Sequence, residues 1–280
     1  MLSRCILKAA LPAVWMLVHV GITQAGEMPS FEAVYDLRLT HASATVGPRA
    51  ASGTYEMRMA ETCDGWDSKS HIALDLAFRD DSSSSNERFF TSWESKSGND
   101  YRFAVRTVKN GKTVEAYNGT AALSKKGGMA RYELPAPEGE QKPRLISVAL
   151  PRDTLFPIAH FRALVTGAES GEALFSSVVL NGASSNGPRV MSVAIGPRLD
   201  NGSADGSANI DRTLLGTPSW RMSSAFFNLN EQRDTPNTEM FLKLYESGVT
   251  ESFEQTFNDF AVAATLKSLR RLDPPNCTKR

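Results

Sequence analysis

A strict alternation of apolar and polar side chains between Gly53 and Phe78 constrains the fold of this chain more than any other feature of its sequence. Within each half of the stretch, large apolar side chains share one set of alternate positions and mostly polar ones share the other: Tyr55, Met57, Met59, Trp66, Ile72, Leu74 and Leu76 against Thr54, Glu56, Arg58, Asp67, Lys69, His71 and Asp75. A period of two is typical of a strand with one buried face. Between the halves, Cys63-Asp64-Gly65 supplies the Asp-Gly pair that favours a tight turn. The stretch therefore predicts a β-hairpin with a cysteine at its turn.

Shorter strand-like runs follow one another along the rest of the chain. They cover residues 31–40, 88–93, 101–108, 113–117, 121–123, 129–134, 146–150, 173–180, 190–195, 220–229, 240–245 and 249–257. Polar stretches at 80–86 and 200–211 are expected to be loops. About a dozen short strands separated by turn residues predict a mainly β protein, a sandwich or a barrel, with residues 26–280 in a single domain.

Two segments depart from this simple pattern. Pro157 suits the first turn of a helix, and the apolar residues after it recur at helical spacing up to the glycines at 167–171, so the sequence predicts one helix there. The segment 259–272 fits a strand through Phe260, Val262, Ala264 and Leu266, but it fits a helix through Leu266, Leu269 and Leu272. We favour the strand.

The first 25 residues have the pattern of a secretory signal peptide. Arg4 and Lys8 lie close to an apolar run from Ala9 to Val20, and Ala25 is the small residue expected before the cleavage point. The run is shorter than the about 20 residues that a membrane-spanning helix needs, which argues against a retained anchor. We therefore expect an exported protein that does not span the membrane.

Two cysteines, Cys63 and Cys277, remain after removal of the leader. An even number of cysteines in an exported protein favours a disulfide. Two separate buried thiols are the alternative. A redox-active pair is disfavoured because the chain lacks the Cys-x-x-Cys spacing.

The sequence contains no recognisable pattern for catalysis or metal binding. His41, His71 and His160 are far apart and lack zinc-site spacing, and there is no Gly-x-Ser-x-Gly elbow. The loop at 200–211 imitates the start of a calcium loop, but Arg212 occupies the position of the essential glutamate. We expect no catalytic residue, metal or cofactor. The mature chain would hold 29 basic and 31 acidic side chains, a balance that also argues against nucleic acid as a partner.

Large aromatic residues fall within the predicted strands, and ordinary core packing is their simplest interpretation. The alternative is a curved sheet whose concave apolar face, carrying Trp66, Trp93 and Trp220, accepts a ligand.

Three motifs together resemble a known family: Cys63-Asp64-Gly65-Trp66, the segment from Leu155 to His160, and the terminal Pro274-Pro275-Asn276-Cys277. The chain is similar, from Phe31 to Cys277, to the EipB-type cell-envelope integrity proteins of the Gram-negative periplasm. The resemblance implies a β-spiral, a curved half-barrel-like antiparallel sheet wrapped around one helix, similar to periplasmic lipoprotein carriers. It also implies a Cys63–Cys277 disulfide and a periplasmic tetratricopeptide-repeat protein as functional partner. Asp64, Gly65, Phe156, Pro157 and His160 would then be structural residues of the family motifs.

The resemblance brings no enzymatic activity with it. We expect a non-enzymatic periplasmic protein that supports envelope integrity by binding a protein partner or an apolar ligand on its concave sheet. A carrier that shuttles a lipid or an acylated protein between membranes is the first alternative. An exported hydrolase is the second, and it would need a serine, a histidine and an acid within hydrogen-bond reach.

Overall fold

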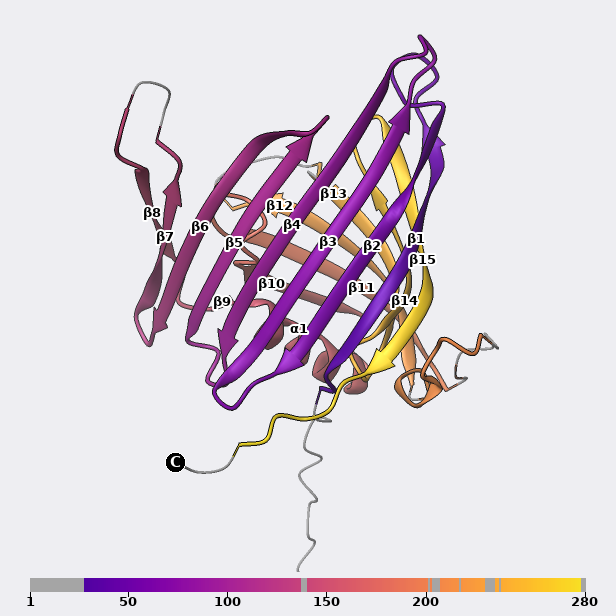
Figure 1. Cartoon of the computed structure of the whole chain (residues 1–280). Coiled ribbons are helices and arrows are strands. Elements are labelled where there is room, and N and C mark those ends of the chain that lie inside the picture. Colours follow the sequence, from indigo (N-terminus) through magenta and orange to yellow (C-terminus); the bar gives the residue numbers. More distant parts are fainter. Residues whose placement is uncertain are drawn as a thin grey trace, which may run out of the picture.

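The computed structural model describes residues 28–136, 140–200, 202, 207–216, 218–229, 235–236 and 238–277. The predicted signal peptide at 1–25 lies outside these residues. The described part of the chain forms one 15-stranded sheet and one α-helix, α1 (Pro157–Glu169) (Figure 1).

The strands vary from two to 13 residues in length. In chain order they are β1 (Phe31–Ala42), β2 (Ala50–Glu61), β3 (Gly65–Ala77), β4 (Ser83–Ser95), β5 (Asp100–Lys109), β6 (Lys112–Ser124), β7 (Gly127–Leu134), β8 (Arg144–Leu150), β9 (Thr154–Leu155), β10 (Leu174–Val179), β11 (Arg189–Leu199), β12 (Ser219–Asn228), β13 (Thr238–Tyr245), β14 (Thr250–Thr256) and β15 (Phe260–Arg271).

The order of the strands requires the sheet to curl almost into a barrel. The order is β8-β7-β6-β5-β4-β3-β2-β1-β15-β14-β13-β12-β11-β10-β9, so β8 and β9 are its two edges. Only Pro151, Arg152 and Asp153 separate these edge strands along the chain, so the two edges must come close in space. Neighbouring strands are antiparallel, apart from the short β9, which runs parallel to β10. The predicted mainly β fold, with a curved antiparallel sheet around one helix, is confirmed.

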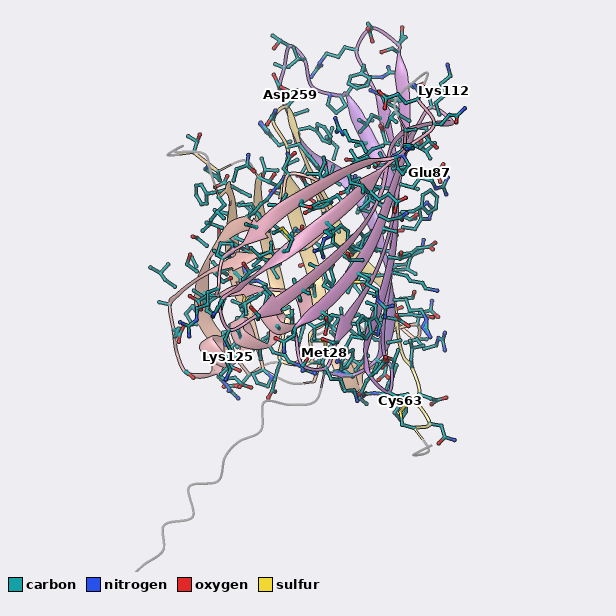
Figure 2. All side chains as sticks on the ribbon, turned by 90° about the vertical axis from the view of Figure 1, so that its left-hand side faces the viewer. Met28, Cys63, Glu87, Lys112, Lys125 and Asp259 are labelled. Atoms are coloured by element: carbon teal, nitrogen blue, oxygen red, sulfur yellow. A yellow bond between two sulfur atoms is a disulfide. The ribbon has the colours of Figure 1, made fainter. Side chains whose placement is uncertain are left out.

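The two ends of the barrel differ. Figure 2 places Met28 and Cys63 at one end, and Figure 1 places α1 at the same end; we call it the helix end. Lys112 and Asp259 lie at the opposite end, which we call the mouth (Figure 2).

The predicted hairpin around Cys63 is formed by β2 and β3. Tyr55 pairs with Ile72, and Glu61 pairs with Trp66 next to the turn. Because side chains alternate between the two faces of a strand, the apolar positions of both strands point into the barrel. The pairing of β2 and β3 therefore places the alternating apolar side chains of the sequence on the inner face of the sheet.

The ambiguous segment 259–272 is strand β15, as favoured. Tyr35 of β1 pairs with Leu266, whereas Val34 pairs with Ser268, so a bulge at Lys267 inserts one extra residue. A bulge changes the face on which the following side chains lie. Leu266 and Leu269 are therefore both buried, at 5% and 2% exposure. The bulge explains why the sequence spacing imitates a helix.

Three local predictions need correction. The serine-rich stretch 80–86 is only partly a loop, because β4 already begins at Ser83. The runs 113–117 and 121–123 are a single strand, β6, continuous through Gly119. The last part of the predicted loop 200–211 is not an exposed connection, since Ile210 is buried and pairs with Leu269. The middle of that loop, residues 203–206, lies outside the described residues.

Candidate functional site

Helix α1 closes the helix end of the barrel, and a distant carboxylate fixes its start. The helix begins at Pro157 without a local capping side chain. Instead, Oε2 of Glu94, at the end of β4, accepts a hydrogen bond from the Ile158 N–H at 2.7 Å, and Oε1 accepts one from the Ala159 N–H at 2.9 Å. These N–H groups would otherwise have no partner within the helix. Glu94 therefore anchors the helix to the sheet.

The environment of Glu94 makes its ionisation unusual. The residue is only 2% exposed, and burial raises its pKa to about 7. The two backbone hydrogen bonds and the positive charge of Arg162 act in the opposite direction but do not cancel the effect of burial. Arg162 also lies over the ring of Trp66, at 5.6 Å from its centroid.

The rest of the helix packs into the barrel through its apolar face. Ile158 lies in a cluster with Met28 and Trp66. Leu164 and Val165 lie in a second cluster with Trp220, which is 1% exposed. The helix is therefore a packed floor of the interior rather than a surface element.

The residues of the predicted family motifs all lie near this floor. A Cβ at Gly65 would lie 2.3 Å from the carbonyl oxygen of Glu94, so this position has no room for another residue. Phe156 is fully buried and stacks on Tyr101, with the ring centroids 5.0 Å apart. Pro157 is the first residue of the helix. Their contacts are those of structural residues.

His160 is a buried histidine on the inner side of the helix. Its Nδ1 lies 3.0 Å from Oγ of Ser177, and its Nε2 has no hydrogen-bond partner. Burial lowers its pKa to about 4, so the ring is neutral. A serine–histidine pair is the start of a hydrolase triad, but among the described residues no acid is hydrogen-bonded to this ring.

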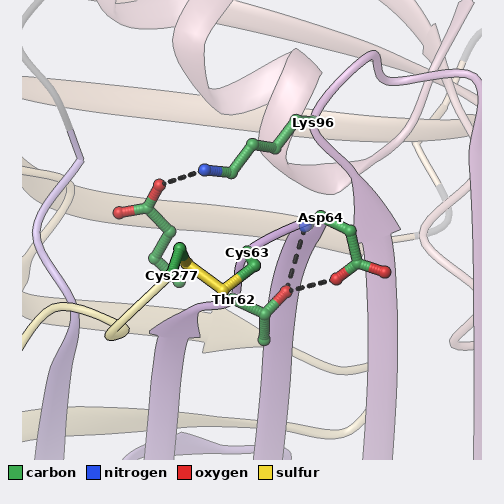
Figure 3. The surroundings of a disulfide bond; sticks show 7 residues. Thr62, Cys63, Asp64, Lys96 and Cys277 are labelled. Atoms are coloured by element: carbon green, nitrogen blue, oxygen red, sulfur yellow. Dashed lines mark hydrogen bonds and ion pairs between the residues drawn. A yellow bond between two sulfur atoms is a disulfide. The ribbon is translucent and has the colours of Figure 1, made fainter. Parts of the chain in front are cut away.

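A disulfide joins two segments that are distant in sequence at the helix end. Cys63 and Cys277 form the disulfide, with Cα atoms 5.6 Å apart (Figure 3). The turn that holds Cys63 is stabilised because Thr62 Oγ1 donates to Asp64 Oδ1 at 3.0 Å and accepts from the Gly65 N–H at 3.0 Å. The C-terminal tail therefore lies against the β2–β3 turn.

Inward-facing side chains become more accessible from the helix end toward the mouth. Along β1, the exposed fraction is 1% at Phe31 and 6% at Leu37, and Leu39 is only partly buried. Along β12, Trp220 is fully buried, whereas Phe226 is partly accessible. Both strands run from the helix end to the mouth. Along these two strands the interior therefore opens toward the mouth, whereas on β2 Ala51, near the mouth, is itself buried. We call the space above the helix the lumen; its wall is mainly apolar, with Arg88 and Glu115 as charged exceptions.

Within this lumen lies a cavity of about 220 Å³, enclosed by β1–β3 on one side and by β13 and β14 on the other. Tyr35, Tyr55 and Phe253 form its aromatic wall, with ring centroids 5.5 to 5.8 Å apart. The Tyr35 hydroxyl donates to the carbonyl of Thr250 at 2.7 Å. Burial raises the pKa of Tyr55 to about 12, so its hydroxyl stays neutral. The cavity is suited to an uncharged, apolar group.

A loop bridges the seam between the two edges of the sheet. Inside the barrel, Arg88 of β4 donates to Oγ1 of Thr107 at 2.7 Å, to Oε2 of Glu115 at 2.8 Å and to the carbonyl of Ala183 at 2.6 Å. Ala183 follows β10, the neighbour of the edge strand β9, so these contacts join that side of the sheet to β4, β5 and β6 across the barrel. A few residues further on, a Cβ at Gly187 would lie 2.8 Å from Cγ1 of Val148 on β8. The loop 181–187 thus ties the barrel together without a ladder of strand hydrogen bonds.

The three tryptophans predicted as a ligand face do not share one face. Trp66 and Trp220 are buried against α1. Trp93 precedes Glu94 on β4, and Glu94 points inward opposite Trp66. Side chains alternate along a strand, so Trp93 lies on the outer surface, where Arg102 covers its ring at 4.2 Å. The accessible apolar wall of the lumen consists instead of residues such as Ile72 and Phe253.

His71 lies on the outer surface of the barrel. His71 stacks on Phe89 on the outer face, with centroids 4.3 Å apart, and its Nε2 lies 3.1 Å from Oε2 of Glu87. Within the described ranges, no group of three or more His, Cys, Asp or Glu side chains is placed to hold a metal ion. The described part of the chain also has no helix that combines the length and apolar character needed to cross a membrane.

Sequence reasoning missed Glu94, because the predicted strand 88–93 ended one residue before it. The sequence did contain a clue to its position. Glu94 follows Phe90 by four residues, so the two side chains lie on the same, buried face of the strand. A carboxyl group at such a position needs hydrogen-bond donors. Its donors belong to a helix 64 residues further along the chain.

Comparison with known proteins agrees with the family resemblance that the three motifs indicate. Residues 22–273 match the EipB-like protein family. The cell envelope integrity protein EipB of Brucella abortus is 24% identical over 240 residues, which cover 85% of this chain and 82% of that protein. A crystal structure of a β-barrel-like protein of a domain of unknown function, also from Brucella abortus, shares the fold with a TM-score of 0.78 at 20% identity, over 88% of this chain and 99% of that one. This chain belongs to the EipB-like family.

Proposed function

We propose that this protein supports cell envelope integrity as a non-enzymatic periplasmic protein that holds an apolar ligand in the lumen of its barrel. The observation that carries the proposal is the accessibility of the inner wall. Partly exposed apolar side chains such as Ile72, Met240 and Phe253 surround a cavity of about 220 Å³ that leads toward the mouth. Exposed apolar surface of this kind is typical of a binding site.

The shape of the lumen favours a slender ligand. Small-molecule sites usually measure roughly 300–1,000 Å³, so the cavity of about 220 Å³ accommodates only part of a ligand. The rest would extend through the lumen. A single acyl chain fits this description, whereas a folded partner does not fit inside a nearly closed barrel. A tetratricopeptide-repeat partner would have to bind outside.

The role of a carrier is the second candidate, and the lumen also supports it. A maintenance protein could keep its ligand, whereas a carrier must release it to a membrane. Both versions require an exported protein, which the leader pattern at 1–25 supports. Sequencing the N-terminus of protein purified from the periplasm tests this requirement, and we expect it to begin at Gly26, with residues 26–280 as one domain.

The lumen is tested by a pair of substitutions on neighbouring residues of β3. Ile72 points into the cavity, and Ala73 points outward. We expect Ile72→Trp to fill the cavity and weaken the binding of a fluorescent fatty acid at least about tenfold, a change worth about 1.4 kcal/mol. Ala73→Trp should leave binding unchanged. Native mass spectrometry of the wild type should show a co-purifying lipid. Equal binding by both variants would refute the lumen as the site.

A further inference from the structure

Several exposed apolar side chains are gathered at the mouth. Val46 lies in the turn between β1 and β2, Phe257 in the turn between β14 and β15, and Val114 near the start of β6. Their exposed fractions are 61%, 39% and 60%. Val46 and Phe257 lie on turns and Val114 is the third residue of β6, and all three leave apolar surface uncovered. We call these three residues the apolar rim.

The turns of the rim are held in place by hydrogen bonds. The Ser43 N–H donates to the carbonyl of Asp259 at 2.7 Å, which joins the Val46 turn to the Phe257 turn. The Phe257 N–H donates to the carbonyl of Phe260 at 2.8 Å, and the two rings stack with centroids 4.8 Å apart. Phe260 lies on the same face of β15 as Val262 and Ala264, whose side chains point into the barrel. The exposed ring of Phe257 is therefore continuous with the apolar wall of the lumen.

Positive charges accompany the apolar rim. Arg79, Lys109 and Lys112 are exposed in the turns at this end and form no ion pair with the residues that the structure describes. Acidic groups are also present: Asp259 is exposed in the Phe257 turn itself, and Asp80 keeps its charge while it accepts from the Ser82 hydroxyl at 2.6 Å. Asp81 is paired with Arg49 at 3.5 Å. The unpaired cations are free to meet phosphate groups.

We propose that the mouth docks on the surface of a lipid bilayer, with Val46 and Phe257 inserted among the acyl chains and the cations of the mouth against the lipid phosphates. The apolar side chains project from separate turns rather than forming a flat patch. A bilayer accepts separate insertions, whereas a protein partner needs a matching pocket for each. The inference rests on the proposed function, because a ligand with an acyl chain would pass between membrane and lumen through this end.

The test is co-sedimentation of the full mature protein with vesicles of phosphatidylethanolamine and phosphatidylglycerol. The test variant is the double substitution Val46→Asp and Phe257→Asp. The matched control is Leu174→Asp, at the first residue of β10 near the helix end, where the side chain is 77% exposed. We expect the double variant to lose vesicle binding at least about tenfold, since burying two apolar side chains is worth more than one tenfold step. The control should bind as the wild type does.

Binding of a fluorescent fatty acid in solution is measured for the same proteins. The rim variant should keep this binding, because neither Val46 nor Phe257 lines the cavity. If the wild type takes up the fatty acid but does not bind vesicles, or if the rim and control variants bind vesicles equally, docking is refuted and the proposed function survives. If the wild type binds vesicles but not the fatty acid, the proposed function fails instead. Phosphatidylcholine vesicles should bind more weakly, because they carry no net negative charge for the cations to meet.

Discussion

Glu94 and Ile158 are separated by 64 residues in the chain, yet the carboxylate of the first accepts the backbone N–H of the second at 2.7 Å. This contact joins the only α-helix among the described residues to the sheet that surrounds it. The helix forms the floor of the lumen, so the depth of the lumen depends on it. The same contact also makes the position of the floor sensitive to the protonation of one buried group.

The pKa of Glu94 gives the first prediction. Burial raises it from an ordinary value of 4.5 to about 7, so between these values the folded protein binds more protons than the unfolded one. The contribution of Glu94 to stability is therefore full below pH 4.5 and is lost as the pH rises through about 7. Glu94→Gln removes the titrating group and so lacks this pH-dependent loss, while its amide nitrogen cannot accept one of the two backbone N–H bonds at any pH. When the pH is raised from 5 to 8, we expect the free energy of unfolding of the variant to rise by roughly 1–3 kcal/mol relative to that of the wild type.

Urea denaturation of both proteins at the two pH values measures this change. Glu133→Gln, at an exposed position of β7, is the control and should follow the wild type. Parallel pH profiles for Glu94→Gln and wild type would contradict the raised pKa.

His160 should have the opposite effect on the pH dependence of stability, in an overlapping pH range. Burial lowers its pKa from 6.5 to about 4, so the folded protein binds fewer protons than the unfolded one between these values. Its contribution is present above pH 6.5 and is lost as the pH falls toward 4. We expect His160→Asn to be less destabilised by acid than wild type, by roughly 1–3 kcal/mol between pH 7 and pH 4.5. A chemical shift titration of the ring that shows a pKa near 6.5 would rule this out.

These two groups show what the sequence could and could not predict. Strand positions follow from local alternation, and the hairpin around Cys63 needed nothing else. The partners of Glu94 and His160 lie on other elements, so their environment depends on the tertiary fold. Trp93 is wrongly expected on the concave face because both faces of its strand carry aromatic residues, Phe89 and Trp93 on one and Phe90 on the other, so the alternation does not show which face is buried. The bulge at Lys267 does leave a mark in the sequence, the helix-like spacing of Leu266 and Leu269, but that spacing alone cannot be told from a helix.

The disulfide leads to the third prediction. It closes a loop with a sequence separation of 214 residues, and the chain-entropy model assigns roughly 5 kcal/mol to a loop of this length, as an upper value. Cys63→Ser and Cys277→Ser should therefore lower stability by equal amounts, and the double variant should lose no more than either single one. Non-reducing electrophoresis of the wild type should show a mobility shift on reduction. Unequal losses would mean that the two residues act separately.

Arg88 gives the last prediction, which concerns the seam of the barrel. Its guanidinium joins Glu115 to the carbonyl of Ala183, and its side chain is 29% exposed. Arg88→Ala removes these hydrogen bonds and leaves the Glu115 carboxylate without its cation. We expect a loss of roughly 1–3 kcal/mol in stability and faster release of a fluorescent fatty acid, because the loop 181–187 no longer holds the two edges together.

The matched control for this prediction is Arg106→Ala. Arg106 lies over the ring of Phe89 at 4.2 Å on the outer face, so its removal takes away an arginine without touching the loop. Stopped-flow release should be unchanged in the control and accelerated in Arg88→Ala. If Arg88→Ala is destabilised but releases the fatty acid at the wild-type rate, the loop 181–187 does not limit the release of the ligand through the mouth.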